Sequence, residues 1–339
     1  MAKTFGLQWH VTNECDQRCK HCYIWQKHEK EKIHVNPTIE QCYKIIEDFL
    51  SFCREMGVDP HFSITGGDPL LYSHIWELLE AIKEKEISFT ILGNPFGLTP
   101  QIVSRLKNLG CTNYQMSLDG LEATHDSMRK KGSFQSTLQA IPLLHKYGVR
   151  SMIMTTVSLL NYREVADVVK LCVANKVGNF AFARYCPTHG DVEYNMSPKL
   201  YRQYLASIWQ VYNKLVNEGT KFSLKDHLWT AFLYEEGLID SCEEKDIVVD
   251  GCNCAISHMT LLSNGTVYAC RRFESAVGDI NVQNFKEIFL SSEMNKYRQI
   301  ENLSGCNSCD LLNYCRGCHA VAAGTTGNFF DKDPQCWRR

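Results

Sequence analysis

Three cysteines near the start of the chain have the spacing of a metal-cluster loop. Cys15, Cys19 and Cys22 follow the pattern C-x3-C-x2-C directly after an apolar segment. Three thiolates can hold three corners of a cubane four-iron cluster, whereas an electron-transfer cluster normally takes four. The fourth iron is then open, and an open coordination position is where a metal binds substrate. Polar residues separate the three cysteines, which disfavours the alternative that their thiols line the buried face of a helix.

A second group of cysteines lies in the last third of the chain. Four of them follow the pattern C-x2-C-x5-C-x2-C: Cys306, Cys309, Cys315 and Cys318. Paired C-x2-C knuckles indicate metal ligands, and a zinc ribbon stays an alternative, although its pairs normally lie further apart. Other cysteines flank this quartet: Cys252, Cys254, Cys270 and Cys336. Five others match no pattern and are expected to be buried thiols: Cys42, Cys53, Cys111, Cys172 and Cys186.

The elements that must position the first cysteine loop alternate between strand and helix. Strands are predicted over residues 5–11, 61–65, 89–92, 114–118, 150–157 and 179–185. Amphipathic segments between them predict helices, which gives six βα units in succession. This succession predicts an α/β fold, a partial (β/α)6 TIM-like barrel with parallel strands and right-handed crossovers. Chemistry is expected at the carboxyl ends of the strands, where Gly66, Gly67 and Gly120 allow the backbone to approach a ligand closely.

The alternation stops after Pro187. Ser197 and Pro198 predict the N-cap and first position of a long amphipathic helix that ends at Gly219. A second helix is predicted over residues 225–236, and we interpret the two as a bridge. The predicted domains are therefore a barrel over residues 1–190, a helical bridge over residues 191–250 and a small cysteine-rich iron-sulfur domain over residues 251–339.

Composition and charge make some classes of binding partner unlikely. The chain has 339 residues and a formal net charge of -2, and it has no basic block, so neither nucleic acid nor an anionic membrane surface is expected as a partner. The first residues lack the apolar core of a signal peptide, and no apolar run has membrane-spanning length. We therefore expect a cytoplasmic protein, in which clustered cysteines bind metal more often than they pair as disulfides.

The first cysteine loop, with the aromatic His21 before its last cysteine, resembles the signature of the radical S-adenosylmethionine (SAM) enzymes. The resemblance implies that the cluster on this loop binds SAM and cleaves it reductively to a 5′-deoxyadenosyl radical, which takes a hydrogen atom from the substrate. Gly66-Gly67-Asp68 resembles the family's Gly-Gly-Glu motif, with a shorter acid. The resemblance implies these cofactor contacts: Gly66, Gly67, Asp68, Ser117, Asp119 and Arg129. Asn94 and Arg184 rank below them, and no histidine is assigned a ligand role.

The segment Cys254-x10-Gly265-x4-Cys270, followed by the quartet and Cys336, resembles the SPASM extension of peptide-modifying radical SAM enzymes, which holds two auxiliary four-iron clusters. The resemblance implies a first auxiliary set of Cys254, Cys270 and Cys318, with Cys252 and Cys242 as candidates for the fourth ligand. It implies a second auxiliary set of Cys306, Cys309, Cys315 and Cys336. The implied cofactors are three [4Fe-4S] clusters and SAM.

The chain also departs from this pattern at two places. The last two quartet cysteines are separated by two residues where the family usually has three. Arg271 stands where anaerobic sulfatase maturases carry an aspartate base, which counts against that activity.

The resemblance implies a maturase of ribosomally synthesised peptides that joins a cysteine sulfur to a carbon as a thioether, similar to the maturases of Ala-Cys-Gly-X repeat peptides. Its expected partners are a short cysteine-containing precursor peptide, an external flavodoxin- or ferredoxin-type electron donor and a separate leader-recognition protein. Leader recognition is expected to be supplied by this separate protein or by the bridge helices, because no winged-helix domain fits before the first strand. Alternatives are peptide epimerisation, carbon-carbon crosslinking, sulfatase maturation, haem-precursor decarboxylation and a non-enzymatic zinc-ribbon binding module.

Overall fold

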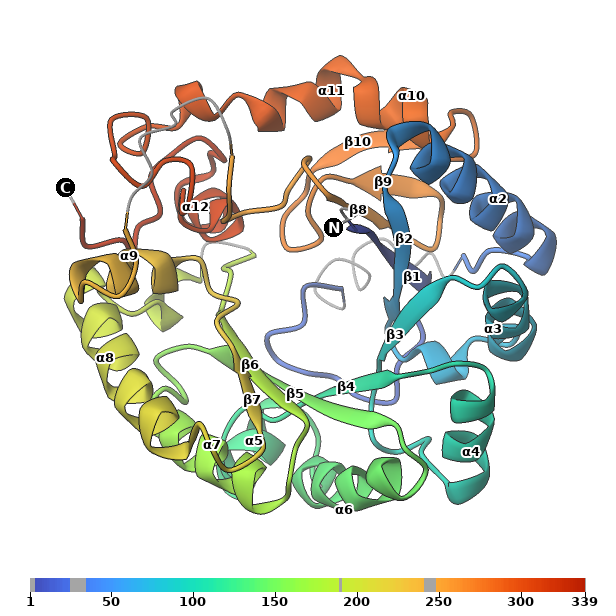
Figure 1. Ribbon diagram of the computed structural model, residues 1–339, viewed down its shortest axis with the longest axis horizontal. Coiled ribbons are helices and arrows are strands. Elements are labelled where there is room, and N and C mark those ends of the chain that lie inside the picture. Colours follow the sequence, from blue (N-terminus) through green and yellow to red (C-terminus); the bar gives the residue numbers. More distant parts are fainter. Residues whose placement is uncertain (1–3, 25–34, 189–190, 241–247, 339) are drawn as a thin grey trace. The chain divides into compact units, whose positions relative to one another are not determined.

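A computed structural model describes residues 4–24, 35–188, 191–240 and 248–338, which fold into two compact units (Figure 1). The first unit contains Met1–Met116, Arg129–Met152 and Cys254–Arg298. The second unit contains Ser117–Met128, Ile153–Asn253 and Gln299–Arg339. The candidate ligand Cys242 lies outside the described residues.

The first unit is built on strands in the order β10-β9-β8-β1-β2-β3-β4. Their bounds are β1 Thr4–Thr12, β2 Asp59–Gly66, β3 Ser88–Leu92, β4 Asn113–Ser117, β8 His258–Leu261, β9 Thr266–Tyr268 and β10 Ala276–Asp279. Strands β1 to β4 and β8 pair in parallel, with Trp9 opposite both Ile64 and Leu261, whereas β9 and β10 are antiparallel. Because both faces of β1 are covered, the strand is buried along nearly its whole length.

Helices of the first unit connect these strands, and Figure 1 shows α2, α3 and α4 along one side of β1 to β4. Their bounds are α2 Ile39–Met56, α3 Ile75–Glu84, α4 Pro100–Asn108, α6 Ser133–Lys146, α10 Phe285–Leu290 and α11 Ser292–Asn295, with short 3-10 turns over Pro69–Leu71 and Lys296–Arg298. A cluster of aromatic rings at centroid separations of 5.0 to 5.5 Å joins β1 to α2 and α10. Phe5, Phe49, Phe52, Phe285 and Phe289 form this cluster.

The second unit contains β5 Arg150–Val157, whose first residues belong to the first unit, followed in strand order by β6 Asn179–Arg184 and β7 Lys221–Ser223. Its helices are α5 Glu122–Met128, α7 Val165–Ala174, α8 Pro198–Leu215, α9 Leu228–Glu235 and α12 His319–Thr326, with 3-10 turns over Val192–Tyr194 and Ile300–Asn302. Figure 1 shows α7 and α8 side by side. Trp229 of α9 is buried against Phe182 of β6 and Tyr212 of α8.

The predicted α/β alternation and the parallel pairing of the first strands are confirmed, and three local predictions differ from the structure. Helix α8 ends at Leu215, four residues before Gly219, and the short strand β7 follows within the predicted bridge. Helix α9 begins at Leu228 because the Asp226 carboxylate accepts its N–H at 3.0 Å. The short helix α5 was not predicted. No helix in the described ranges is both long and apolar enough to cross a bilayer.

Candidate active site and iron-sulfur ligands

The loop after β1 places Cys15, Cys19 and Cys22 together in the first unit, each thiol partly buried. A tight turn joins two of them, since the Cys22 N–H donates to the Cys19 carbonyl at 3.0 Å. The Cys15 sulfur accepts the backbone N–H of Gln17 at 3.4 Å and the Asn94 side-chain amide at 3.3 Å. Burial raises the pKa of the Cys15 thiol, and these two hydrogen bonds oppose that rise. Donors aimed at a sulfur suit a bound thiolate, so the loop fits a three-thiolate cluster.

Glycines at the end of β2 hold the cysteine loop in place. The Gly67 N–H donates to the Thr12 carbonyl at 2.8 Å, and the Asp68 N–H donates to the Glu14 carbonyl at 2.6 Å. A Cβ atom at Gly66 would lie 2.1 Å from the Thr12 carbonyl oxygen, and one at Gly67 would lie 2.0 Å from that of Glu14. The close approach that these glycines permit is therefore to the chain's own backbone, and their contact with SAM stays a prediction.

Asp68, the acid of the same motif, is buried with an exposed fraction of 1%. Its carboxylate accepts the Leu70 N–H at 3.2 Å. Burial is the main cause that raises the pKa of Asp68 to about 7, and the nearby charge of Asp16 adds to it. A carboxyl group in this setting ionises readily only when a cation is beside it. The site is thus suited to a cationic group such as the ammonium of SAM, for which Asp68 is a predicted contact.

Arg129 lies beside the cysteine loop, as a residue near a SAM site would. Its guanidinium nitrogens are 3.6 Å from the Cys19 sulfur and 3.4 Å from the His21 Nε2 atom. The neighbouring Lys130 donates to the Asp16 carbonyl at 2.9 Å. These contacts place positive charge next to thiols that carry negative charge when they bind iron.

Ser117 and Asp119 belong to the second unit, and the contacts of Asp119 are structural. Its carboxylate accepts the Thr156 N–H at 2.8 Å, and its carbonyl accepts the Asn161 side-chain amide at 2.6 Å. Its own N–H donates to His125 Nδ1 at 3.0 Å. Asp119 is buried and ties the end of β4 to β5, and its predicted SAM contact stays untested.

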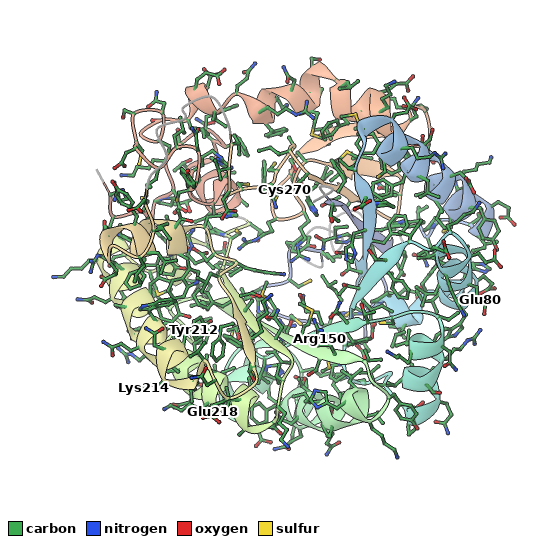
Figure 2. All side chains as sticks on the ribbon, viewed as in Figure 1. Glu80, Arg150, Tyr212, Lys214, Glu218 and Cys270 are labelled. Carbon is green, nitrogen blue, oxygen red and sulfur yellow. The ribbon has the colours of Figure 1, made fainter. Side chains whose placement is uncertain are left out.

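Two predicted auxiliary ligands, Cys254 and Cys270, lie around Tyr297 in the first unit. Burial raises the pKa of Tyr297, and the charges of both cysteines add to that rise. The Cys270 N–H donates to the Ser275 hydroxyl at 3.0 Å. Figure 2 labels Cys270 on the segment that follows β9, whereas the labelled Glu80 lies on α3.

The Tyr23 hydroxyl lies in electrostatic range of both Cys22 of the first cysteine loop and Cys270 of this auxiliary pair. Burial raises the pKa of Tyr23 to about 12, while the charge of Arg271 opposes the rise and those of Cys22 and Cys270 add to it. The hydroxyl also lies 3.4 Å from the Nε2 atom of His10, which is buried on β1. Arg271 itself is half-buried and makes no hydrogen bond or ion pair with any residue that the structure describes.

Four predicted ligands line one cavity of the second unit: Cys306, Cys309, Cys315 and Cys336. Three cationic side chains line it as well: Arg316, Lys332 and Arg338. Burial raises the pKa of Cys306 to about 11 and that of Cys315 to about 12, and the charges of Cys336 and Asp333 add to both rises. Four thiols that line one cavity, with positive charge nearby, fit a four-iron cluster, whose thiolates bring negative charge into the cavity.

The remaining predicted ligands, Cys252 and Cys318, lie around His227 in the second unit. Burial lowers the pKa of His227, but a hydrogen bond to Cys252 and the charges of Cys252 and Cys318 outweigh it and raise the value to about 9. Arg184, which ranked low as a SAM contact, is buried in ion pairs with Asp226 and Asp333.

Sequence reasoning ranked Asn94 low and missed His227. Asn94 is the second residue after β3, near the strand ends where chemistry was expected, so its position in the sequence could have identified it. His227 lies near the start of the helix predicted over residues 225–236, and no spacing relates it to a cysteine. The five thiols outside the patterns are buried as predicted. Within the described ranges, no three His, Cys, Asp or Glu side chains converge on a position for a single metal ion.

Two segments of the chain, the barrel and the cysteine-rich C-terminal segment, match known protein families. The model of the radical SAM superfamily matches residues 9–172, and that of the SPASM iron-sulfur cluster-binding domain matches residues 252–319. The AdoMet-dependent heme synthase of Methanosarcina barkeri is 27% identical over 342 residues, which cover 97% of this chain and 95% of that protein. Mycofactocin maturase MftC of Mycolicibacterium smegmatis is 25% identical over 343 residues, covering 97% and 82%.

Streptococcus suis SuiB bound to S-adenosylmethionine has the same fold, with a TM-score of 0.78 and 19% identity over 99% of this chain and 78% of that one. SuiB has also been solved bound to its precursor peptide SuiA. This likeness confirms the predicted partial barrel with a small C-terminal domain. The two family matches imply SAM and several [4Fe-4S] clusters as cofactors, and reductive cleavage of SAM requires an external reductant. The chain is thus a radical SAM enzyme with a C-terminal SPASM domain.

Proposed function

We propose that this enzyme modifies a ribosomally synthesised, cysteine-containing peptide and forms a thioether between a cysteine sulfur and a carbon atom. The observation that carries the proposal is the position of Tyr23, whose hydroxyl is electrostatically coupled to both Cys22 and Cys270. A substrate near Tyr23 would lie near one thiol of the first cysteine loop, Cys22, and one auxiliary thiol, Cys270. The shared fold with SuiB, which binds a precursor peptide, supports a peptide as the substrate.

Thioether formation is a balanced two-electron oxidation of the peptide. When bound, SAM on the first cluster supplies the radical that removes one hydrogen atom, and an auxiliary cluster supplies an acceptor for one electron. Bond formation between the carbon and the sulfur releases that electron, and the thiol proton leaves to solvent. The chain's own residues orient these groups: Asn94 and Arg129 contact the loop thiols, and Asp68 offers a buried carboxylate to the methionyl ammonium.

The test is anaerobic co-expression of the enzyme with a candidate short cysteine-containing peptide, chosen from the reading frames beside the gene, followed by measurement of the mass of that peptide. We expect the loss of two hydrogens for each modified cysteine, protection of that thiol from alkylation, and neither effect with the Cys15→Ala variant. An unchanged mass in ordinary water with a gain of one deuterium in heavy water would show epimerisation instead. No change in either solvent would overturn the peptide assignment.

Haem-precursor decarboxylation is the second candidate, and one observation favours it. Arg271 and Arg272 both lie in electrostatic range of Tyr23, and Arg271 has no ion pair among the described residues. A guanidinium of this kind can bind a propionate carboxylate bidentately. The similarity to heme synthases over 97% of the chain supports this reading.

Anaerobic incubation with iron coproporphyrin III separates the two candidates. Decarboxylation predicts the loss of carbon dioxide and two hydrogens for each propionate converted to a vinyl group. Arg271→Gln would then slow turnover by about tenfold or more, because a charged hydrogen bond contributes about 1.5–3 kcal/mol. The exposed Arg150, labelled in Figure 2, provides the matched control Arg150→Gln. An unchanged porphyrin would exclude this candidate.

A further inference from the structure

The Asn94 side chain contacts the first cysteine loop at two atoms through its amide nitrogen. This nitrogen donates to the Cys15 sulfur at 3.3 Å and to the Asp16 carboxylate at 2.5 Å. An amide nitrogen has two N–H donors, so each of them has an acceptor here. Both acceptors are negative when Cys15 binds a metal, which requires the nitrogen of the amide, and not its oxygen, to face them. All three residues belong to the first unit.

The backbone on both sides of Asn94 is fixed by β4. The Gly93 N–H donates to the Gln115 carbonyl at 3.1 Å, and the Asn94 carbonyl accepts the hydroxyl of Tyr114 at 2.9 Å. Tyr114 is buried on β4. A Cβ atom at position 93 would clash with the Tyr114 hydroxyl oxygen, so this close approach requires glycine. The Asn94 amide therefore meets the cysteine loop from a rigid support.

The cysteine loop has further anchors that do not involve the Asn94 amide. The Lys130 ammonium donates to the Asp16 carbonyl at 2.9 Å and lies 4.3 Å from the centre of the Phe96 ring. Phe96 is part of the same connection between β3 and α4 as Asn94. The Gly67 N–H holds the loop as well, through the Thr12 carbonyl. Removal of the Asn94 amide should therefore leave the loop and its three thiols in place.

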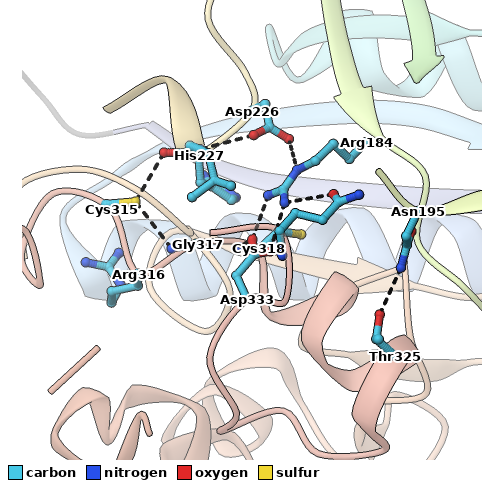
Figure 3. A network of polar contacts seen from close by, with 12 residues as sticks. Arg184, Asn195, Asp226, His227, Cys315, Arg316, Gly317, Cys318, Thr325 and Asp333 are labelled. Carbon is cyan, nitrogen blue, oxygen red and sulfur yellow. Dashed lines mark hydrogen bonds and ion pairs between the residues drawn. The ribbon is translucent and has the colours of Figure 1, made fainter. Parts of the chain in front are cut away.

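The Asn94 contact differs in kind from two other hydrogen bonds to cysteine sulfurs, which come from the backbone. The Cys15 sulfur also accepts the Gln17 N–H at 3.4 Å. In the second unit, the Cys315 sulfur accepts the Gly317 N–H at 3.4 Å, as Figure 3 shows. A backbone N–H is present whatever the side chain is, whereas the Asn94 amide is a donor that the sequence specifies. A substitution can thus remove this one donor and keep the others.

Hydrogen bonds to cluster sulfurs are one of the main determinants of the reduction potential of an iron-sulfur cluster. A donor beside a thiolate stabilises the reduced cluster, which carries the more negative charge, and so raises the potential. A carboxylate beside the cluster has the opposite effect, because like charges repel. The Asn94 amide contacts one group of each kind, the Cys15 sulfur and the Asp16 carboxylate.

We propose that Asn94 is a positioning residue that donates a hydrogen bond to the Cys15 thiolate and thereby raises the reduction potential of the cluster held by the first cysteine loop. The role concerns the electron that cleaves SAM, so it applies equally to a peptide and to a porphyrin substrate. The inference rests on the predicted assignment of Cys15 as a cluster ligand. Asn94 acts on a ligand of the cluster and does not itself bind iron.

The test is a redox titration of the full-length, anaerobically reconstituted protein, followed by electron paramagnetic resonance. The signal of the first cluster is the one that the Cys19→Ala variant lacks. We expect Asn94→Leu and Asn94→Ala, which have no donor at this position, to keep the iron content and to lower the midpoint potential of this signal alone. Asn94→Gln, which retains an amide, is expected to lower it less.

A second pair of variants separates the contact with the sulfur from the contact with the carboxylate. Asp16→Ala removes the carboxylate and is expected to raise the potential of the first cluster, because it removes a negative charge beside it. Addition of Asn94→Leu to this variant should lower the potential again, since the Cys15 sulfur loses its donor. A double variant with the same potential as Asp16→Ala would show that Asn94 acts only through Asp16, and it would overturn the inference.

Asn108→Leu is the matched control, because Asn108 is an exposed residue at the end of α4 in the same unit. An unchanged or raised first-cluster potential in both Asn94→Leu and Asn94→Ala, with iron retained, would overturn the inference and leave the cluster assignment standing. Loss of first-cluster iron in all three Asn94 variants would show that the residue holds the loop together and would overturn the donor role. A Cys19→Ala protein with every signal of the parent would overturn the cluster assignment and this inference with it.

Discussion

The Asp68 carboxyl is the residue in the proposed SAM site whose charge depends most on what binds beside it. Burial raises its pKa to about 7, the charge of Asp16 adds to the rise, and hydrogen bonds from the Leu70 and Asn94 backbones oppose it. Without a cation the group is largely protonated just below neutral pH. A bound ammonium favours the ionised form, so binding of SAM must release a proton over this range.

We therefore predict that the affinity for SAM falls as the pH is lowered from about 8 to about 6, because a growing fraction of Asp68 must ionise on binding. Asp68→Asn should weaken binding and abolish this pH dependence. Isothermal titration calorimetry of the reconstituted enzyme at several pH values measures both effects. Asp167→Asn, which removes an exposed carboxylate paired with Lys170, is the control. An Asp68→Asn variant that keeps the parent pH dependence would contradict the assigned role.

At the scale of elements, the start of α2 illustrates how local sequence fixes a helix that supports the site. Thr38 is the N-cap: its side chain accepts the Gln41 N–H at 3.3 Å, and the Gln41 side chain accepts the Thr38 N–H at 2.8 Å. This capping box satisfies donors that the helix start would leave without partners. Gly57 ends the helix in the left-handed conformation with a φ of 65°.

Thr38→Ala should lower the free energy of unfolding by about 1 kcal/mol, since it removes one side of the capping box. Urea denaturation of the reconstituted protein at constant iron content measures the change. Ser51→Ala on the same helix is the control: its hydroxyl makes only a 3.4 Å contact with Glu55, so stability should stay the same or rise slightly. Equal losses in the two variants would show that the cap contributes nothing specific.

Elements with a strong periodic pattern were predictable from the sequence, and contacts between distant segments were not. The strand over residues 150–157 and the N-cap at Ser197 agree with the structure because each depends on neighbouring residues only. The strand β7 has three residues, too few for a pattern, and it forms because β6 offers a parallel edge. The role of Arg184 depends on Asp333, which is 149 positions away.

At the scale of the whole chain, the candidate ligands divide between the two units in a way that spacing alone could not predict. The first unit contains Cys254 and Cys270 around Tyr297, and the second contains Cys252 and Cys318 around His227. The quartet was recognisable as a metal pattern. The division of its cysteines between two sets came from the family resemblance, and the shared cavity of the second set supports that division.

Iron stoichiometry tests this division over the whole molecule. Three four-iron clusters predict about twelve irons per chain, and loss of one cluster leaves about eight. Cys19→Ala should therefore remove the first cluster, and Cys309→Ala should remove the second auxiliary cluster without affecting the other two. Cys172→Ala is the matched control, because this thiol is buried in α7 and belongs to no set. Zinc in place of iron at the quartet would identify a zinc ribbon, and an unchanged iron content in Cys309→Ala would remove this cysteine from the second set.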